Sequence, residues 1–65
     1  MTLAEIKKEL ETACGFNGVA DVNEEQGFVF LAWDFADSIS DADVARITAM
    51  CSNTDVADKG PLFFV

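Results

Sequence analysis

The fold is decided by the most apolar segment of the chain, Gly27-Phe28-Val29-Phe30-Leu31-Ala32-Trp33-Asp34-Phe35. Aromatic and β-branched residues dominate this segment, and both kinds favour β-structure, so the sequence predicts a strand over residues 28–35. A shorter strand is expected over 19–22. The five residues 23–27 between the two strands end in glycine, which is typical of a hairpin loop. With Val22 facing Phe28, Asp21 becomes a neighbour of Val29 on one face of the sheet.

The residues before this hairpin predict a helix. Thr2 and Glu5 have the spacing of a capping box, in which each side chain accepts a hydrogen bond from the other residue's amide. Apolar residues then recur at helical spacing, and Gly15 stands where a helix commonly ends in a left-handed residue. We therefore expect a helix over 3–14.

A second helix follows the hairpin. Ser40 and Asp43 repeat the capping spacing, and the acidic side chain at Asp43 suits the positive end of the helix dipole. This helix is expected to end near residues 52–53. Residues 54–60 are predicted to be a polar loop, and the apolar segment 62–65 to be a final strand.

The element order α-β-β-α-β predicts an α+β fold in which two helices pack on one face of a three-stranded sheet. Sixty-five residues make one domain, spanning 1–65, with no room for a second core. A right-handed crossover places the final strand parallel to the strand 28–35. We expect it beside that strand, with a position beside the first strand as the alternative.

The central strand is apolar on both faces, and two helices cover only one of them. Because Asp21 neighbours Val29 in the expected register, the face carrying Val29, Leu31 and Trp33 is predicted to be the open one and to bind a partner. The alternative is that the faces are reversed and Trp33 belongs to the core. A one-residue shift of register exchanges the two faces.

The charge of the chain points to its partners. It has 12 acidic and 4 basic residues, for a net charge of −8, and no basic residue lies between Lys8 and Arg46. This charge repels nucleic acids and anionic membranes, so neither is expected to bind directly. It favours a protein with a basic surface. Four carboxylates have no evident structural role and are candidates for that contact, namely Glu24, Glu25, Asp34 and Asp37.

Catalysis and metal binding find little support. The chain has no histidine, and its two cysteines lack the basic neighbours that generate a thiolate. A calcium-loop pattern starting at Asp21 has Gln26 where glycine is required and Ala32 where glutamate is required. We therefore expect no enzyme activity, catalytic residue, metal or cofactor. Reduced cysteines and the absence of a signal-like or membrane-spanning apolar run predict a cytoplasmic protein.

The resulting hypothesis is that the chain is a non-catalytic protein-binding module. It would act as an acidic inhibitor that mimics a nucleic acid and binds to a basic, nucleic-acid-handling protein. Some small phage-encoded inhibitors work in this way. The alternative is a homodimeric structural module or small subunit, joined through the open sheet face, whose acidity serves only solubility. The predicted partner-binding residues are Glu24, Glu25, Val29, Leu31, Trp33, Asp34 and Asp37.

Overall fold

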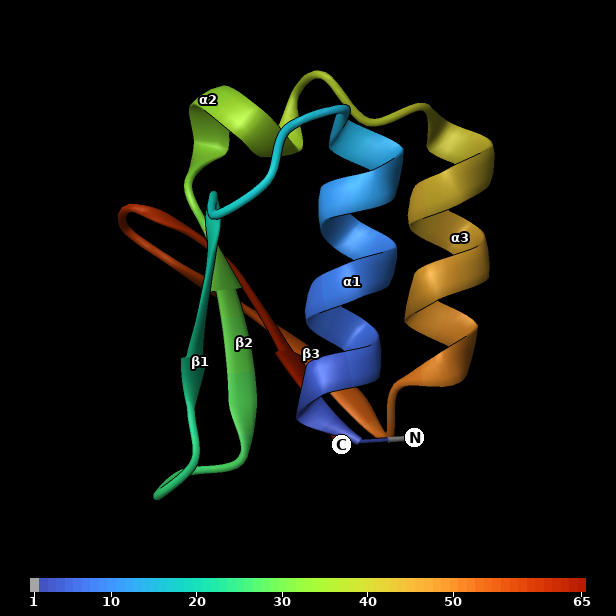
Figure 1. The fold of residues 1–65 in the computed structure, drawn as a ribbon. Coiled ribbons are helices and arrows are strands. Elements are labelled where there is room, and N and C mark those ends of the chain that lie inside the picture. The colour runs from blue at the N-terminus through green and yellow to red at the C-terminus, as the bar shows by residue number, and fades with distance from the viewer. Residues whose placement is uncertain (1) are drawn as a thin grey trace.

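The computed structural model describes residues 2–65 and has an α+β fold. A four-stranded antiparallel sheet lies on one side, and the two longer helices lie side by side on the other (Figure 1). In chain order the elements are α1 (Leu3–Cys14), β1 (Ala20–Asn23), β2 (Phe28–Leu31), α2 (Trp33–Ala36), α3 (Asp41–Met50), β3 (Asn53–Ala57) and β4 (Gly60–Phe64).

The first helix is confirmed over its expected span. The Thr2 hydroxyl accepts from the Glu5 amide, and the Glu5 carboxylate accepts from the Thr2 amide, which completes the capping box. Gly15 ends α1 at a φ of 87°, a left-handed conformation that glycine adopts without steric cost. The sequence signals at both ends of this helix are therefore sufficient to define it.

The third helix begins as expected and ends early. The Ser40 hydroxyl accepts from the Asp43 amide, as an N-cap residue does. The helix stops at Met50, because the following residues are extended and enter β3 at Asn53. α3 runs antiparallel to α1 (Figure 1), so Cys14 and Cys51 lie at opposite ends of the helix layer, and both are free thiols.

The sheet differs from the three-stranded expectation. Its order is β1-β2-β4-β3, and every neighbouring pair is antiparallel. The segment expected to be a loop forms β3, which turns back into β4 as a hairpin. The last strand therefore lies beside β2, as expected, but antiparallel to it, and the predicted parallel crossover is wrong.

The long central strand is also shorter than expected. β2 ends at Leu31, and residues 33–36 form the short helix α2. The Trp33 amide donates to the Lys59 carbonyl at 3.1 Å, and the indole Nε1 of Trp33 donates to the Asp58 carbonyl at 3.2 Å. These bonds hold the start of α2 against the β3–β4 turn, so the chain leaves the sheet at this point.

The register of the β1–β2 hairpin is one residue away from the expected one. Val22 lies opposite Val29, and Ala20 lies opposite Leu31. Because side chains alternate along a strand, this shift exchanges the two faces. The core between sheet and helices is formed by Ile6, Leu10, Cys14, Ala20, Val29, Leu31, Ile39, Ile47 and Phe63.

Candidate functional site

The sheet has one face that no helix covers. Strand pairing arranges its side chains in two rows across the four strands, in the order β1, β2, β4, β3. The first row is Asp21, Phe30, Leu62 and Asp55, and the second is Asn23, Phe28, Phe64 and Asn53. We call these eight residues the open face. Each row has apolar residues on the two central strands and a polar residue on each edge strand.

The apolar centre of the open face is only partly shielded from solvent. Phe28, Phe30, Leu62 and Phe64 are all half-buried. The rings of Phe28 and Phe64 pack edge to face across β2 and β4, with centroids 5.4 Å apart. Contiguous exposed apolar surface is uncommon in monomeric proteins and marks interaction sites. This stripe is therefore the strongest candidate for an interface on the sheet.

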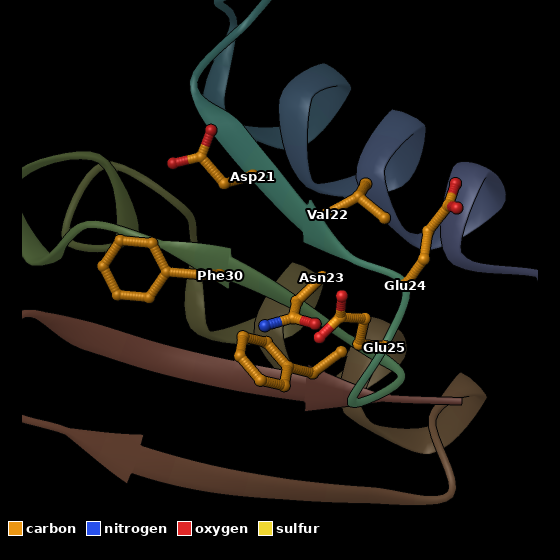
Figure 2. Close-up of a pocket in the computed structure, with 7 residues that line it drawn as sticks. Asp21, Val22, Asn23, Glu24, Glu25 and Phe30 are labelled. Carbon is orange, nitrogen blue, oxygen red and sulfur yellow. The ribbon is translucent and has the colours of Figure 1, made fainter.

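A shallow hollow of about 600 Å³ lies at the β1–β2 end of this face, and Figure 2 shows its lining. Asp21, Asn23 and Phe30 point to one side of the sheet, whereas Val22 and Glu24 point to the other. The alternation agrees with the strand register. The full lining is Asp21, Val22, Asn23, Glu24, Glu25, Phe28 and Phe30. Aromatic rings and carboxylates thus meet in one open depression.

The basic residues lie elsewhere. Lys7 and Lys8 are on α1, Arg46 is on α3, and Lys59 is in the β3–β4 turn. Arg46 bridges the helix layer by pairing with Glu9 of α1 and with Asp43 of its own helix. The hydrogen bond from Arg46 to Glu9 is the main reason that the pKa of the guanidinium is raised. Lys7 and Arg46 therefore pair with carboxylates of the helices, and within residues 2–65 no basic residue belongs to the open face.

One carboxylate is buried, and its role is structural. Glu11 accepts from Lys7 Nζ at 2.9 Å and from the Ala20 amide at 3.2 Å, which joins α1 to the first residue of β1. The hydrogen bond from Lys7, with help from the Ala20 amide, lowers the pKa of Glu11 against the opposing effect of burial. A carboxylate held ionised in this way cannot act as a general acid near neutral pH.

Neither thiol has the surroundings of a nucleophile. Burial raises the pKa of Cys51, which disfavours the reactive thiolate. The Cys14 sulfur is buried and lies 3.3 Å from the Ser38 hydroxyl and 3.5 Å from the Phe35 carbonyl. Within residues 2–65, no group of three or more histidine, cysteine, aspartate or glutamate side chains is placed to hold a metal ion. The site offers binding chemistry: apolar area, amides and carboxylates.

The predicted partner-binding residues separate into three groups. Val29 and Leu31 are both 0% exposed and face the helices, so their assignment to the open face is wrong. Glu24 and Glu25 lie in the β1–β2 loop and line the hollow. Trp33, Asp34 and Asp37 lie on or beside α2, at the opposite end of β2 (Figure 1). Trp33 is 38% exposed, and it lines a different groove together with Asp37.

Sequence reasoning missed the residues that form the centre of the open face. The expected register puts Phe28 and Phe30 on the covered face, and Asp55 falls in the expected loop. One sequence signal is present in β1, because Asp21 and Asn23 alternate with Val22. Polar residues at every second position indicate the solvent side of a strand.

Among residues 2–65, no helix combines the length and the apolar character needed to cross a membrane. The chain matches no protein-family model, no curated protein and no solved structure.

Proposed function

We propose that this protein is a non-catalytic binding module whose open face docks on a basic surface of another protein. One observation carries the proposal: an uncovered sheet face has an apolar centre between two acidic or amide-bearing edges. Protein interfaces have this anatomy, with an apolar core and a polar rim. The rim here bears carboxylates at Asp21 and Asp55, so the complementary rim is basic.

The same arrangement supports inhibition of a nucleic-acid-handling protein. The edge strands β1 and β3 are separated by three strand spacings, or about 14 Å at about 4.8 Å each. Two carboxylate-bearing edges on either side of an apolar stripe resemble two phosphate backbones on either side of stacked bases. The separation of the edges is close to the width of the B-DNA major groove, which is about 12 Å. A basic groove shaped for a nucleic acid would receive Asp21, Glu25 and Asp55 in place of phosphates.

Affinity capture tests this proposal when it includes a matched pair of variants. Asp21→Asn with Glu25→Gln removes two negative charges from the open face and its loop. Thr12→Lys with Ala49→Lys adds two positive charges at exposed positions of α1 and α3. Each pair of substitutions changes the net charge from −8 to −6. A partner bound through the open face is lost from the first variant and retained by the second.

The captured partner also responds to salt and to competitor. It elutes at moderate salt, because the rim contacts are electrostatic and screened. For a nucleic-acid-handling partner, added duplex DNA releases it from the immobilised protein. If both variants lose the partner equally, net charge alone attracts it, and the open face is rejected as its binding site. Retention in the presence of excess duplex DNA would reject the mimicry.

A homodimer is the second candidate, and the half-buried Phe28, Phe30, Leu62 and Phe64 favour it. Packing two open faces together would bury these rings, but it would also bring acidic edges of two highly negative chains together. Light scattering on a size-exclusion peak distinguishes the candidates. A dimer that appears only in high salt supports self-association, and a monomer at high micromolar concentration in both salts excludes it.

A further inference from the structure

A second surface feature lies on the helix side of the sheet. α3 packs mainly on α1 and leaves part of the β3–β4 hairpin uncovered, so a groove of about 270 Å³ remains between them. Its walls are largely apolar. The lining residues that matter here are Trp33, Asp37, Val44, Val56 and Pro61.

The groove is open to solvent along its two walls. Val56 of β3 lies opposite Pro61 on the side of the sheet that faces the helices, yet its side chain is 71% exposed. Val44 of α3 is 38% exposed. A helix packed closely on this hairpin would cover both valines. The groove is therefore an unfilled part of the helix–sheet layer.

Trp33 is held at one end of the groove in a fixed position. Its amide and its indole Nε1 both donate to carbonyls of the β3–β4 turn, those of Lys59 and Asp58. Lys59 belongs to that turn and does not line the groove. An indole fixed in this way is a preformed wall for apolar or cationic groups, since cations are attracted to its face.

Size and charge define what fits. Sites for small-molecule ligands usually have volumes of about 300–1,000 Å³, so this groove is below that range and has room for one or two side chains. Asp37, beside the end of α2, places a carboxylate in its lining. Within residues 2–65, no basic side chain lines it. An apolar side chain with a positive charge beside it is complementary to this groove.

We propose that the groove receives an apolar side chain, flanked by lysine or arginine, from a segment of the basic partner. The inference rests on the proposed function for the character of the partner, and it adds a separate anchor. Burial of one leucine-sized side chain is expected to raise the affinity by roughly tenfold or more. Charge on the open face would then attract the partner, and the groove would hold one of its side chains.

The groove has a built-in reporter, because Trp33 is the only tryptophan of the chain. The probe is a capped peptide with a central leucine and two arginines on each side, and its control carries serine in place of leucine. The leucine peptide is expected to shift Trp33 fluorescence to shorter wavelength in a saturable titration. Its affinity is expected to exceed that of the serine peptide by about tenfold.

Two valine substitutions localise the effect. Val56→Glu places a charge at the mouth of the groove, whereas Val65→Glu makes the same change just after β4, at an exposed position that lines neither the groove nor the hollow. Both variants have the same net charge and, by far-UV circular dichroism, should keep the fold. Val56→Glu is expected to lower the affinity for the leucine peptide to that for the serine peptide, although the added carboxylate attracts arginine. Val65→Glu is expected to bind the leucine peptide as the parent does.

Three outcomes would contradict the proposal that the groove binds a side chain, and would leave the basic-partner proposal intact. Equal affinity of the leucine and serine peptides would show attraction by charge alone. Unchanged Trp33 emission, with peptide-induced shifts of the Phe28 and Phe30 amide resonances, would place binding on the open face. Equal loss of leucine-peptide affinity in Val65→Glu and Val56→Glu would show that the groove has no special role. Failure of the proposed function would appear separately, as the absence of any salt-sensitive captured protein.

Discussion

Val22 of β1 lies directly opposite Val29 of β2, and this pairing determines which side of the sheet is available to a partner. It places Val29 and Leu31 under the helices and leaves Phe28 and Phe30 on the open face. If Val22 lay opposite Phe28 instead, Phe28 and Phe30 would face the core. The location of the whole candidate interface therefore depends on one residue of register.

The first prediction tests this register by unfolding. Leu31→Ala should cost about 3 kcal/mol, because it removes a fully buried side chain and leaves a cavity. Phe30→Ala should cost about 1 kcal/mol, since the ring is half-buried and mainly makes cross-strand contacts. Urea denaturation followed by circular dichroism measures both. A larger loss for Phe30→Ala than for Leu31→Ala would contradict the register.

Helix ends were predictable from the sequence because their signals are local. Thr2, Glu5 and Gly15 define α1 through contacts within a few residues, and the structure confirms each of them. The hairpin register is different, because it depends on how residues 23–27 turn. Gly27 has a φ of 78°, and its amide donates to the Asn23 carbonyl, so four residues and not five separate the strands. No spacing of apolar residues in the strands reveals that difference.

The other missed elements depend on distant contacts. β3 has little apolar character of its own, since four of its five residues are exposed. It forms because β4 provides a partner. α2 replaces the end of the expected strand because Trp33 bonds to a turn more than twenty residues later. Those contacts also create the groove, so the groove was not predictable before the hairpin was known.

The second prediction concerns Gly60, where the backbone of β4 lies very close to the end of β2. A Cβ at Gly60 would overlap the carbonyl oxygen of Leu31 and lie 3.0 Å from the Cα of Ala32. Both are backbone atoms, so an alanine side chain forces β4 away from β2. Gly60→Ala should lower the free energy of unfolding by about 3 kcal/mol or more, at the upper end of the usual range for single substitutions.

Gly18→Ala is the matched control. Gly18 has a φ of 79°, and no atom lies within 4 Å of the place that a Cβ would take there, so only the left-handed conformation is penalised. That penalty is about 1–2 kcal/mol. Thermal unfolding of both variants by calorimetry compares them. Equal losses would show that β2 and β4 accommodate a methyl group at Gly60 without separating.

The third prediction is a pH dependence that arises from Glu11. Its pKa is lowered in the folded protein, chiefly by Lys7 and also by the Ala20 amide. A lowered folded-state pKa stabilises the fold above the ordinary glutamate value of about 4.3, and this stabilisation is lost as the pH falls through the folded-state pKa. Glu11→Gln should therefore unfold at a lower urea concentration than the parent near pH 7. The difference between the two urea midpoints should narrow below about pH 4.3.

Glu24→Gln serves as the control, because it removes the same charge at an exposed position in the hairpin loop. Its midpoint should follow that of the parent across the same pH range apart from a uniform charge effect. The measurement is a series of urea titrations between acid and neutral pH. A gap between parent and Glu11→Gln that stays constant with pH would mean that the Lys7 and Ala20 contacts do not favour the ionised form.

The fourth prediction concerns Trp33, whose indole fixes the β3–β4 turn to the start of α2. Trp33→Phe keeps an aromatic ring in place but removes the Nε1 hydrogen bond to the Asp58 carbonyl, which should cost about 1 kcal/mol. Amide hydrogen exchange should also accelerate across β3, because this edge strand pairs with one strand of the sheet, β4.

Phe16→Leu provides the comparison, since it also shortens an aromatic side chain at a surface position. Phe16 is 57% exposed and contacts the ring of Phe35 outside the sheet. Its substitution should leave exchange in β3 at the parent rate. If Trp33→Phe also leaves β3 exchange unchanged, the indole bond does not restrain the hairpin. The β3 wall of the groove would then be held by β4 alone, and any preformed shape it has would come from strand pairing.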